Sequence, residues 1–305
     1  MMKNKINGWL IIDKPYDIGS TNVVSKLKWL LKPEKIGHAG TLDPLATGVL
    51  PIAFGSATKT IPFVMDGKKT YVFEVTWGKE TSTDDKEGDV LFQSDKRPSR
   101  EEIECLLPQF HGVVMQIPPV YSALKVNGKR AYDLARKGEN IELKARPVQI
   151  DSLKILSHES DKTVFEVVCG KGTYVRSIGH DLGRLCGCYG FISSLRRTKC
   201  GPFDVNCSIL LENLEKNVYN TLDSHLISVL TALDDILVLA VNETEKDELI
   251  HGRSISIKRF INESVVEAHQ LSDEKIIGLK WQNQLIALAK TEKKNLKPYR
   301  VFAVE

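Results

Sequence analysis

Several features are missing from this 305-residue sequence, and each absence excludes a class of protein. Six cysteines are few for a disulfide scaffold of this length, and no two of them form a C-x-x-C pair, which indicates free thiols in a reducing compartment. The first residues contain no cleavable apolar segment, and no run approaches the roughly 18 apolar residues that a membrane span needs. We therefore expect a soluble cytoplasmic protein that is neither secreted nor bound to a membrane.

The common motifs for nucleotides and metals are also absent. The chain has no G-x-x-x-x-G-K-[ST] loop, no G-x-G-x-x-G after a strand and no G-x-S-x-G elbow. Its seven histidines include no H-E-x-x-H pair, and Cys186 and Cys188 stand only one residue apart, which is a poor spacing for structural zinc. We expect an enzyme built on this chain to work without a metal ion and without a cofactor.

The charged residues that are present are unevenly distributed. The formal net charge is only +3, from 42 Lys and Arg against 39 Asp and Glu. Six basic residues and one acid lie between Lys171 and Cys200, and seven basic residues and three acids lie between Tyr121 and Arg146. Residues 205–250 hold nine acids and two lysines. Each basic segment alone is compatible with the solvated face of a helix, but together they favour a polyanion as partner.

Hydrophobic spacing predicts short strands and helices in an irregular order. β-Branched and aromatic runs predict strands at Trp9 to Ile12, Tyr71 to Trp77 and Val164 to Cys169. Apolar residues at the 3.6-residue period predict three helices. The first follows Ser20 and ends at Pro33, and the second follows the capping box of Ser99 and Glu102. The third runs from about Tyr174 to Leu185, and its inward residues are Val175, Ile178, Leu182 and Leu185. Because strands and helices do not alternate regularly, we expect an α+β fold with a mixed or antiparallel sheet.

The pattern changes after the acidic segment. A short helix is predicted from Asn242 to His251, closed by Gly252. It precedes strand candidates around Ser254 to Ile257, Val265 to Ala268, Ile276 to Lys280, Leu285 to Ala289 and Tyr299 to Val304. We therefore expect a small β-rich domain that is joined to the rest of the chain near Leu233.

Two segments have a composition that suggests a functional site. Gly37 to Leu50 contains three glycines, a histidine and an Asp-Pro step, which is typical of tight turns and of close approach to a ligand. An Asp before a Pro most often serves a turn or a helix cap, so both this role and a catalytic one are open for Asp43. Gly170 to Gly183 contains Arg176, for which a salt bridge and a phosphate contact are both open.

Six motifs in these regions together resemble the bacterial tRNA pseudouridine-55 synthases, the TruB family. They are D-K-P at 13–15, G-H-A-G-T-L-D-P-L-A-T-G-V-L at 37–50, K-K-T-Y at 68–71, P-P-V-Y-S-A-L-K-V-N-G-K-R-A-Y at 118–132, G-T-Y-V-R-S-I-G-H-D-L-G at 172–183 and L-R-R-T at 195–198. The resemblance implies a mixed, mainly antiparallel sheet with a central cleft in a catalytic domain at 1–233, an RNA-clamping insertion at about 117–146, and a PUA-like RNA-binding domain at 234–305. It also implies isomerisation of a uridine in the T-arm of tRNA to pseudouridine.

The resemblance also assigns catalytic residues. It implies that Asp43 is the catalytic aspartate and that Arg176 reaches it across the cleft, which would favour the ionised form that a nucleophilic carboxylate needs. Tyr71 is similar to the tyrosine that stacks on the target base and assists removal of the proton from C5. From the residues alone, Tyr71 would be read as a core aromatic of a sheet.

The remaining assignments concern the binding of RNA. His38 resembles the histidine that fills the place left by the flipped base, and Tyr174 and Leu195 match residues that line the pocket of that base. Contacts to the RNA backbone are expected from basic side chains, namely Lys125, Lys129, Arg130, Arg196 and Arg197. The expected partner is the T-arm stem-loop of tRNA, bound by a monomer that needs no protein partner.

Two other functions are compatible with the same scaffold. One is a catalytically silent tRNA-binding protein or RNA chaperone, against which the complete set of Asp43, Tyr71 and Arg176 argues. The other is a pseudouridine synthase that depends on a guide RNA. The short chain and the bacterial type of the motifs argue against this function. Activity of the pure protein on a bare T-arm stem-loop distinguishes all three.

Overall fold

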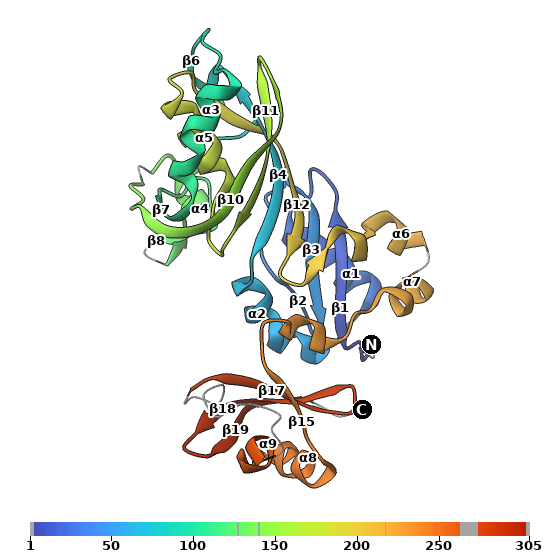
Figure 1. The fold of residues 1–305 in the computed structure, drawn as a ribbon. Coiled ribbons are helices and arrows are strands. Elements are labelled where there is room, and N and C mark those ends of the chain that lie inside the picture. The colour runs from blue at the N-terminus through green and yellow to red at the C-terminus, as the bar shows by residue number, and fades with distance from the viewer. Residues whose placement is uncertain (1–2, 127, 140, 217, 263–273, 303–305) are drawn as a thin grey trace.

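The computed structural model describes residues 3–126, 128–139, 141–216, 218–262 and 274–302 (Figure 1). Two sheets organise this part of the chain: a ten-stranded sheet in the first two thirds and a five-stranded sheet near the C-terminus. Figure 1 shows the second sheet as a separate layer below the first, reached by the chain after α7. The predicted α+β class and the separate β-rich C-terminal part are confirmed.

The ten-stranded sheet is mixed and mainly antiparallel. Its main path runs β14-β1-β3-β12-β4-β11-β10-β7, with β13 paired to β12 and β2 paired to β3. Two of its pairings are parallel, β1 with β14 and β12 with β3. The strands are β1 (Gly8–Lys14), β2 (Ile36–His38), β3 (Thr47–Phe54), β4 (Lys69–Trp77), β7 (Gly112–Gln116), β10 (Arg146–Glu159), β11 (Lys162–Cys169), β12 (Gly190–Cys200), β13 (Phe203–Asp204) and β14 (Ile209–Leu210).

The strands predicted from β-branched and aromatic residues form because alternate side chains enter one core. On β11, every second residue is buried, and Phe165 packs against Phe73 of β4 with 5.2 Å between the ring centroids. Trp77 adds an edge contact to Phe165, and its indole N–H donates to Thr163 Oγ1 at 2.9 Å. Aromatic packing of this kind stabilises neighbouring strands. It fixes the register of β4, the strand that carries Tyr71.

Helices cover both faces of this sheet. α1 (Ser20–Leu31) ends where Lys32 turns into the left-handed region (φ 44°), directly before Pro33. α3 (Arg100–Leu106) begins with the expected capping box of Ser99 and Glu102. The shorter helical elements are η1 (Gly55–Thr60), α2 (Ile61–Asp66), η2 (Leu107–Phe110), α4 (Ala131–Ala135), η3 (Val205–Cys207), α6 (Leu211–Lys216), α7 (Val218–His225) and η4 (Val229–Leu233).

α5 (Val175–Leu185) is the helix that bears on function, because Tyr174 is its N-cap and Arg176 lies in its first turn. Val175, Ile178 and Leu182 enter the core together with Phe73 and Val75, as the periodicity predicts. The prediction that Leu185 points inward is wrong, since 50% of Leu185 is exposed. Leu182 and Cys186 beside it are buried, whereas Leu185 lines an open hollow together with Phe110 and Val114.

Two small hairpins project from the main sheet. β5 (Lys79–Thr81) pairs with β6 (Val90–Gln93), and the turn between them contains residues 82–89. The segment at 117–146 follows β7 and precedes β10, and within it β8 (Lys125–Val126) pairs with β9 (Lys129–Arg130). Its start is fixed to α5, because Ser177 Oγ donates to the Ile117 carbonyl at 2.8 Å.

The C-terminal sheet has the order β15-β17-β18-β19-β16. Its elements are β15 (Val238–Ala240), α8 (Glu243–Ile250), β16 (Ile255–Ser256), α9 (Lys258–Asn262), β17 (Ile276–Trp281), β18 (Gln284–Glu292) and β19 (Asn295–Val301). The strand expected at Tyr299 to Val304 is observed at Asn295–Val301. The strand candidate at Val265 to Ala268 lies outside the described residues. Leu285, Leu288 and Phe302 share one core cluster with Val229 and Leu233, so this sheet packs firmly on the first domain.

Candidate active site

The loop between β2 and β3 presents Asp43 at the surface of the sheet. Ser20, at the start of α1, holds the loop, because its Oγ accepts from Leu42 N at 2.8 Å and donates to Leu42 O at 2.9 Å. The buried Lys14 ammonium donates to Pro44 O at 3.0 Å. Desolvation lowers the pKa of Lys14 to about 8, and the nearby Asp43 carboxylate opposes this shift. The loop is therefore fastened on both sides of Asp43.

Two glycines allow the loop to run close to β12. Gly40 and Gly48 have φ values of +91° and +99°, which side chains rarely adopt. A Cβ atom at Gly48 would lie 2.2 Å from the backbone oxygen of Arg197. Glycine is thus required at 48 by both the backbone angle and the space, which explains part of the unusual composition of this segment.

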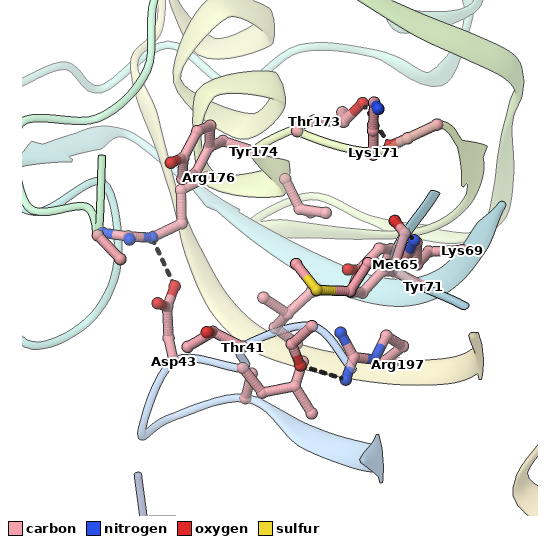
Figure 2. A pocket seen from close by; sticks show the side chains of 18 of the residues that line it. Thr41, Asp43, Met65, Lys69, Tyr71, Lys171, Thr173, Tyr174, Arg176 and Arg197 are labelled. Atoms are coloured by element: carbon pink, nitrogen blue, oxygen red, sulfur yellow. Dashed lines mark hydrogen bonds and ion pairs between the residues drawn. The ribbon is translucent and has the colours of Figure 1, made fainter. Parts of the chain in front are cut away.

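Asp43 is paired with Arg176, as the resemblance implies. Arg176 Nε lies 3.0 Å from Asp43 Oδ2, and the side chains are 6% and 41% exposed, respectively (Figure 2). The rest of the guanidinium donates to the carbonyls of Thr83 (3.0 Å) and Tyr121 (2.8 Å). Arg176 is therefore held rigidly and directs one N–H at a carboxylate that still reaches solvent, which suits a carboxylate that must meet a ligand.

A second carboxylate, Asp85, supports Arg176 and was not found from the sequence. Asp85 Oδ2 lies 3.6 Å from Arg176 Nη1, and its side chain is 9% exposed. Its Oδ1 accepts from Thr83 Oγ1 at 2.5 Å and from Glu87 N at 3.1 Å. Burial raises the pKa of the neighbouring Asp84 to about 6. In the sequence these acids belong to an ordinary polar turn, so no local pattern distinguishes Asp85 from a turn residue.

Next to Asp43 lies a cavity of about 340 Å³, within the range of small-molecule sites. Its walls come from the Asp43 loop, from the end of α2 with the start of β4, from the loop before α5 and from β12. Figure 2 shows Asp43 and Arg176 at one side and Tyr71 and Arg197 at the other. The predicted residues Asp43, Tyr71, Tyr174, Arg176 and Leu195 all line this cavity.

Tyr71 and Tyr174 are held differently. Tyr71 stands on β4, where burial raises the pKa of its phenol to about 12, so the hydroxyl is protonated at neutral pH. Tyr174 is fixed through its backbone, because Tyr174 N donates to Gln116 Oε1 at 2.8 Å and its carbonyl accepts from Gln116 Nε2 at 3.0 Å. The Arg146 guanidinium lies 5.1 Å from the centre of the Tyr174 ring. Both rings offer surfaces for stacking.

His38 was predicted to contact the place of the flipped base, but it does not line the cavity. It ends β2, opposite Ile52 of β3, and its Nδ1 is buried without a hydrogen-bond partner in the described part of the chain. Desolvation and, to a lesser extent, the Arg197 charge lower the pKa of His38, so the imidazole is neutral at neutral pH. Its role in replacing a flipped base stays a prediction.

The basic residues expected on the RNA backbone fall into different environments. Lys125, Lys129 and Arg130 are exposed on the β8–β9 hairpin. Arg196 forms two hydrogen bonds with Asp13, of 2.9 and 2.7 Å. Arg197 is 1% exposed and donates to backbone carbonyls, so the structure corrects the prediction that it reaches an RNA backbone from the surface. Its place is in the wall of the cavity.

The described residues contain neither a metal-binding cluster nor a membrane-spanning helix. Within residues 3–126, 128–139, 141–216, 218–262 and 274–302, no three His, Cys, Asp or Glu side chains are grouped so that they could hold a metal ion. In the same residues, no helix has the length and apolar character needed to span a bilayer.

Two solved structures have this fold over nearly the whole chain. A chain of a Cbf5-Nop10-Gar1 complex superposes with a TM-score of 0.74 at 24% identity, covering 97% of this chain and 85% of that one. A chain of an H/ACA RNP bound to a substrate RNA containing 2'-deoxyuridine gives a TM-score of 0.73 at 21% identity, with coverages of 97% and 85%. At these identities the comparison establishes the fold alone.

Sequence comparison defines the class more narrowly. Residues 28–175 match the profile described as TruB family pseudouridylate synthase (N terminal domain). Residues 176–238 match that of the tRNA pseudouridylate synthase B C-terminal domain. The tRNA pseudouridine synthase B of Sinorhizobium medicae (strain WSM419) is 46% identical over 307 residues, which is 98% of this chain and 96% of the relative. That of Brucella ovis (strain ATCC 25840 / 63/290 / NCTC 10512) is 46% identical over 318 residues, with coverages of 97% and 96%.

The family profile and the relatives define the chain as a pseudouridine synthase, an isomerase. Within this class the chain belongs to the TruB family. The resemblance seen in the six motifs is thereby confirmed.

Proposed function

We propose that this protein converts the uridine at position 55 in the T-arm of tRNA to pseudouridine, with Asp43 as the catalytic aspartate. The observation that carries the proposal is the pair of Asp43 Oδ2 and Arg176 Nε, 3.0 Å apart, beside a cavity of about 340 Å³. A protein that only binds RNA has no need of a carboxylate there, because carboxylates repel phosphates. The names of the relatives that are 46% identical support tRNA as the substrate.

The uridine must leave its stack before it can enter the cavity. Extrusion of a base costs a few kcal/mol, which contacts in the complex must offset. In our proposal the flipped base stacks on Tyr71 and contacts Tyr174 and Leu195, all of which line the cavity. His38, neutral through burial, takes the vacated position without carrying a charge into the base stack.

The reaction exchanges one bond to C1′ of the ribose for another. The N1–C1′ bond breaks, the free uracil rotates, and a C5–C1′ bond forms. The hydrogen on C5 leaves as a proton, and N1 gains one, so the product is an isomer of the substrate. Asp43 acts as the ionised carboxylate, either by attacking the sugar or base or by promoting loss of a proton from the ribose. Arg176 directs this carboxylate, and Tyr71 serves the proton transfer from C5.

RNA binding is assigned to two groups of exposed basic residues. The first is the β8–β9 hairpin with Lys125, Lys129 and Arg130, within the segment at about 117–146. The second lies on the C-terminal domain at 234–305, which we propose binds RNA as a PUA-like module. Its described sheet exposes the basic side chains of Lys275, Lys290, Lys293, Lys294, Lys297 and Arg300. Arg196, whose side chain is 38% exposed next to Asp13, is proposed as a further contact to the RNA backbone.

The decisive experiment uses the purified chain and a T-arm stem-loop transcript. The RNA is digested after incubation, and its nucleosides are separated by liquid chromatography with fragment analysis, because pseudouridine and uridine have the same mass. We expect pseudouridine at position 55, formed by a cytoplasmic monomer with no guide RNA and no protein partner. Light scattering on the same sample checks the monomer. Binding of the stem-loop without product would favour the silent tRNA-binding or chaperone function.

Neutralising the hairpin is expected to weaken RNA binding and its dependence on salt. In the triple variant Lys125→Gln, Lys129→Gln, Arg130→Gln, each lost phosphate contact should reduce the log–log salt slope by roughly 0.7 to 0.9. The control neutralises Lys28, Lys32 and Lys35, which are exposed on and after α1 and have no assigned contact. Binding is measured by filter retention from about 50 to 200 mM salt. An unchanged slope in the hairpin variant would remove this hairpin from the RNA interface.

A further inference from the structure

Arg197 occupies a central position that the assigned reaction does not use. It lies on β12, where its Cα partners are Tyr71 on β4 at one side and Gly48 on β3 at the other. Residues that pair directly across neighbouring strands point to the same face of the sheet. The Arg197 side chain therefore projects between the tyrosine of the active site and the strand that follows the Asp43 loop.

The guanidinium of Arg197 joins the two ends of that loop. Its Nε donates to Val49 O at 2.7 Å, and its Nη2 donates to Gly40 O at 3.0 Å. Asp43 lies between these two carbonyls in the chain. Nη1 is close enough to Gly40 that a Cβ atom there would lie 3.2 Å from it. The planar guanidinium makes the two bonds from separate nitrogen atoms, Nε and Nη2, whereas a lysine would have to make both from one nitrogen.

The charge of Arg197 is buried without a countercharge. The residue is 1% exposed, and no carboxylate in the described part of the chain stands within ion-pair distance of it. Lys14, Lys69 and His38 lie near enough to feel its charge. A buried cation among other basic groups is costly unless negative charge develops close to it.

Tyr71 is the group at which such charge can develop. A neutral phenol is a very weak base, so Tyr71 can take the proton from C5 only with negative charge on its oxygen. Burial opposes that charge. Arg197, which is paired with Tyr71 across the sheet, carries the positive charge that favours it.

We propose that Arg197 is a positioning residue for the isomerisation. Its guanidinium fixes both ends of the loop that presents Asp43, and it stabilises the phenolate of Tyr71, which forms when the phenol gives up its proton and is neutralised when its oxygen takes the proton from C5. The inference rests on the proposed function, in which Tyr71 serves this proton transfer. The step is balanced, because the phenol proton of Tyr71 passes through solvent to N1, the proton on C5 then passes to the Tyr71 oxygen and restores the phenol, and the C–H electron pair stays in the uracil ring.

The test compares wild type, Arg197→Gln, Arg197→Lys and Tyr71→Phe in single turnover. The T-arm stem-loop carries either hydrogen or deuterium at C5 of the target uridine. We expect Arg197→Gln to be slower by about 10- to 100-fold, as for loss of a hydrogen bond to a charged group. It should show a larger C5 isotope effect than wild type, because proton removal becomes the slow step. Arg197→Lys keeps the positive charge but not the planar guanidinium. Its rate should therefore lie between the rates of wild type and Arg197→Gln.

The dependence on pH gives a second readout. Because proton removal is the slow step only in Arg197→Gln, the rate of this variant should follow the fraction of Tyr71 phenolate and rise more steeply from pH 7 to 9 than that of wild type. Thermal melting and stem-loop affinity are measured for each variant. Arg97→Gln serves as the control, because Arg97 forms an ion pair with Asp161 on the surface.

The outcomes separate this inference from the proposed function. Wild type that makes no pseudouridine refutes the proposed function itself. If wild type is active and Arg197→Gln is slow with the isotope effect and pH profile of wild type, the residue merely supports the loop, and the role at Tyr71 is overturned. An Arg197→Gln variant at the wild-type rate overturns the whole inference. If Arg197→Gln does not fold, Arg197→Lys provides the test. Wild-type kinetics in Arg197→Lys would then overturn the inference about Arg197.

Discussion

Replacing Asp43 by asparagine is expected to abolish pseudouridine formation while leaving RNA affinity within a few fold of wild type. Asparagine has nearly the same shape, and its side-chain oxygen can still accept from Arg176 Nε, which in the wild type lies 3.0 Å from Asp43 Oδ2. The change therefore removes a negative charge and leaves the fold intact. Because an amide is neither a nucleophile nor a base for this reaction, we expect the single-turnover rate to fall by at least about 10⁴-fold.

The preserved affinity is the diagnostic part of this result. A carboxylate that faces RNA phosphates is unfavourable for binding, so its loss should not weaken the complex. Stem-loop affinity is measured by filter retention in an enzyme titration, and the single-turnover rate by nucleoside chromatography at saturating enzyme. Asp161→Asn, at an exposed carboxylate that pairs with Arg97 at the surface, is the matched control and should retain full activity. Measurable turnover by Asp43→Asn would refute the role assigned to Asp43.

Sequence patterns predicted the strands and helices that have a signal within their own residues, such as a hydrophobic period or a capping residue. Each of β1, β4, β11, α1 and α5 has its own periodicity or cap, and the structure places all five close to the predicted residues. The exposed Leu185 shows the limit of periodicity, because the spacing of apolar residues does not say how completely the neighbouring elements cover each of them. The strand order, in which β12 inserts between β3 and β4, depends on pairing between distant segments and had no local signal.

The same limit applies within the site. The family resemblance brought Asp43, Tyr71 and Arg176 together, and the structure places all three at one cavity. The places of Arg197 and Asp85 in the site depend on tertiary packing, for which the sequence contains no local signal. From its sequence, an arginine beside another arginine indicates a basic surface, but alternation on β12 leaves Arg196 at the surface and turns Arg197 into the sheet. The buried charge was visible only after β12 had been placed between two strands.

Removing the side chain of Arg176 is the second change with a large expected effect. Arg176→Ala deprives Asp43 of its partner and breaks the bonds to Thr83 O and Tyr121 O, which join the β5–β6 turn and the inserted segment to α5. It also leaves the buried Asp85 carboxylate without its cation. Loss of one partner from such a network costs about 2–4 kcal/mol, so the free energy of unfolding should fall by that amount. Turnover should fall far more than RNA affinity, and a loss confined to affinity would make Arg176 a phosphate contact.

A second substitution separates the catalytic effect of Arg176 from its structural one. In the Arg176→Ala background, Asp85→Asn removes the uncompensated charge, while the oxygen of the new amide can still accept from Thr83 Oγ1 and Glu87 N. The double variant should regain part of the lost stability in urea denaturation, because the orphan carboxylate is the main source of the cost. It should regain no turnover, since nothing then directs Asp43. Recovery of activity together with stability would mean that Arg176 serves only to hold the fold.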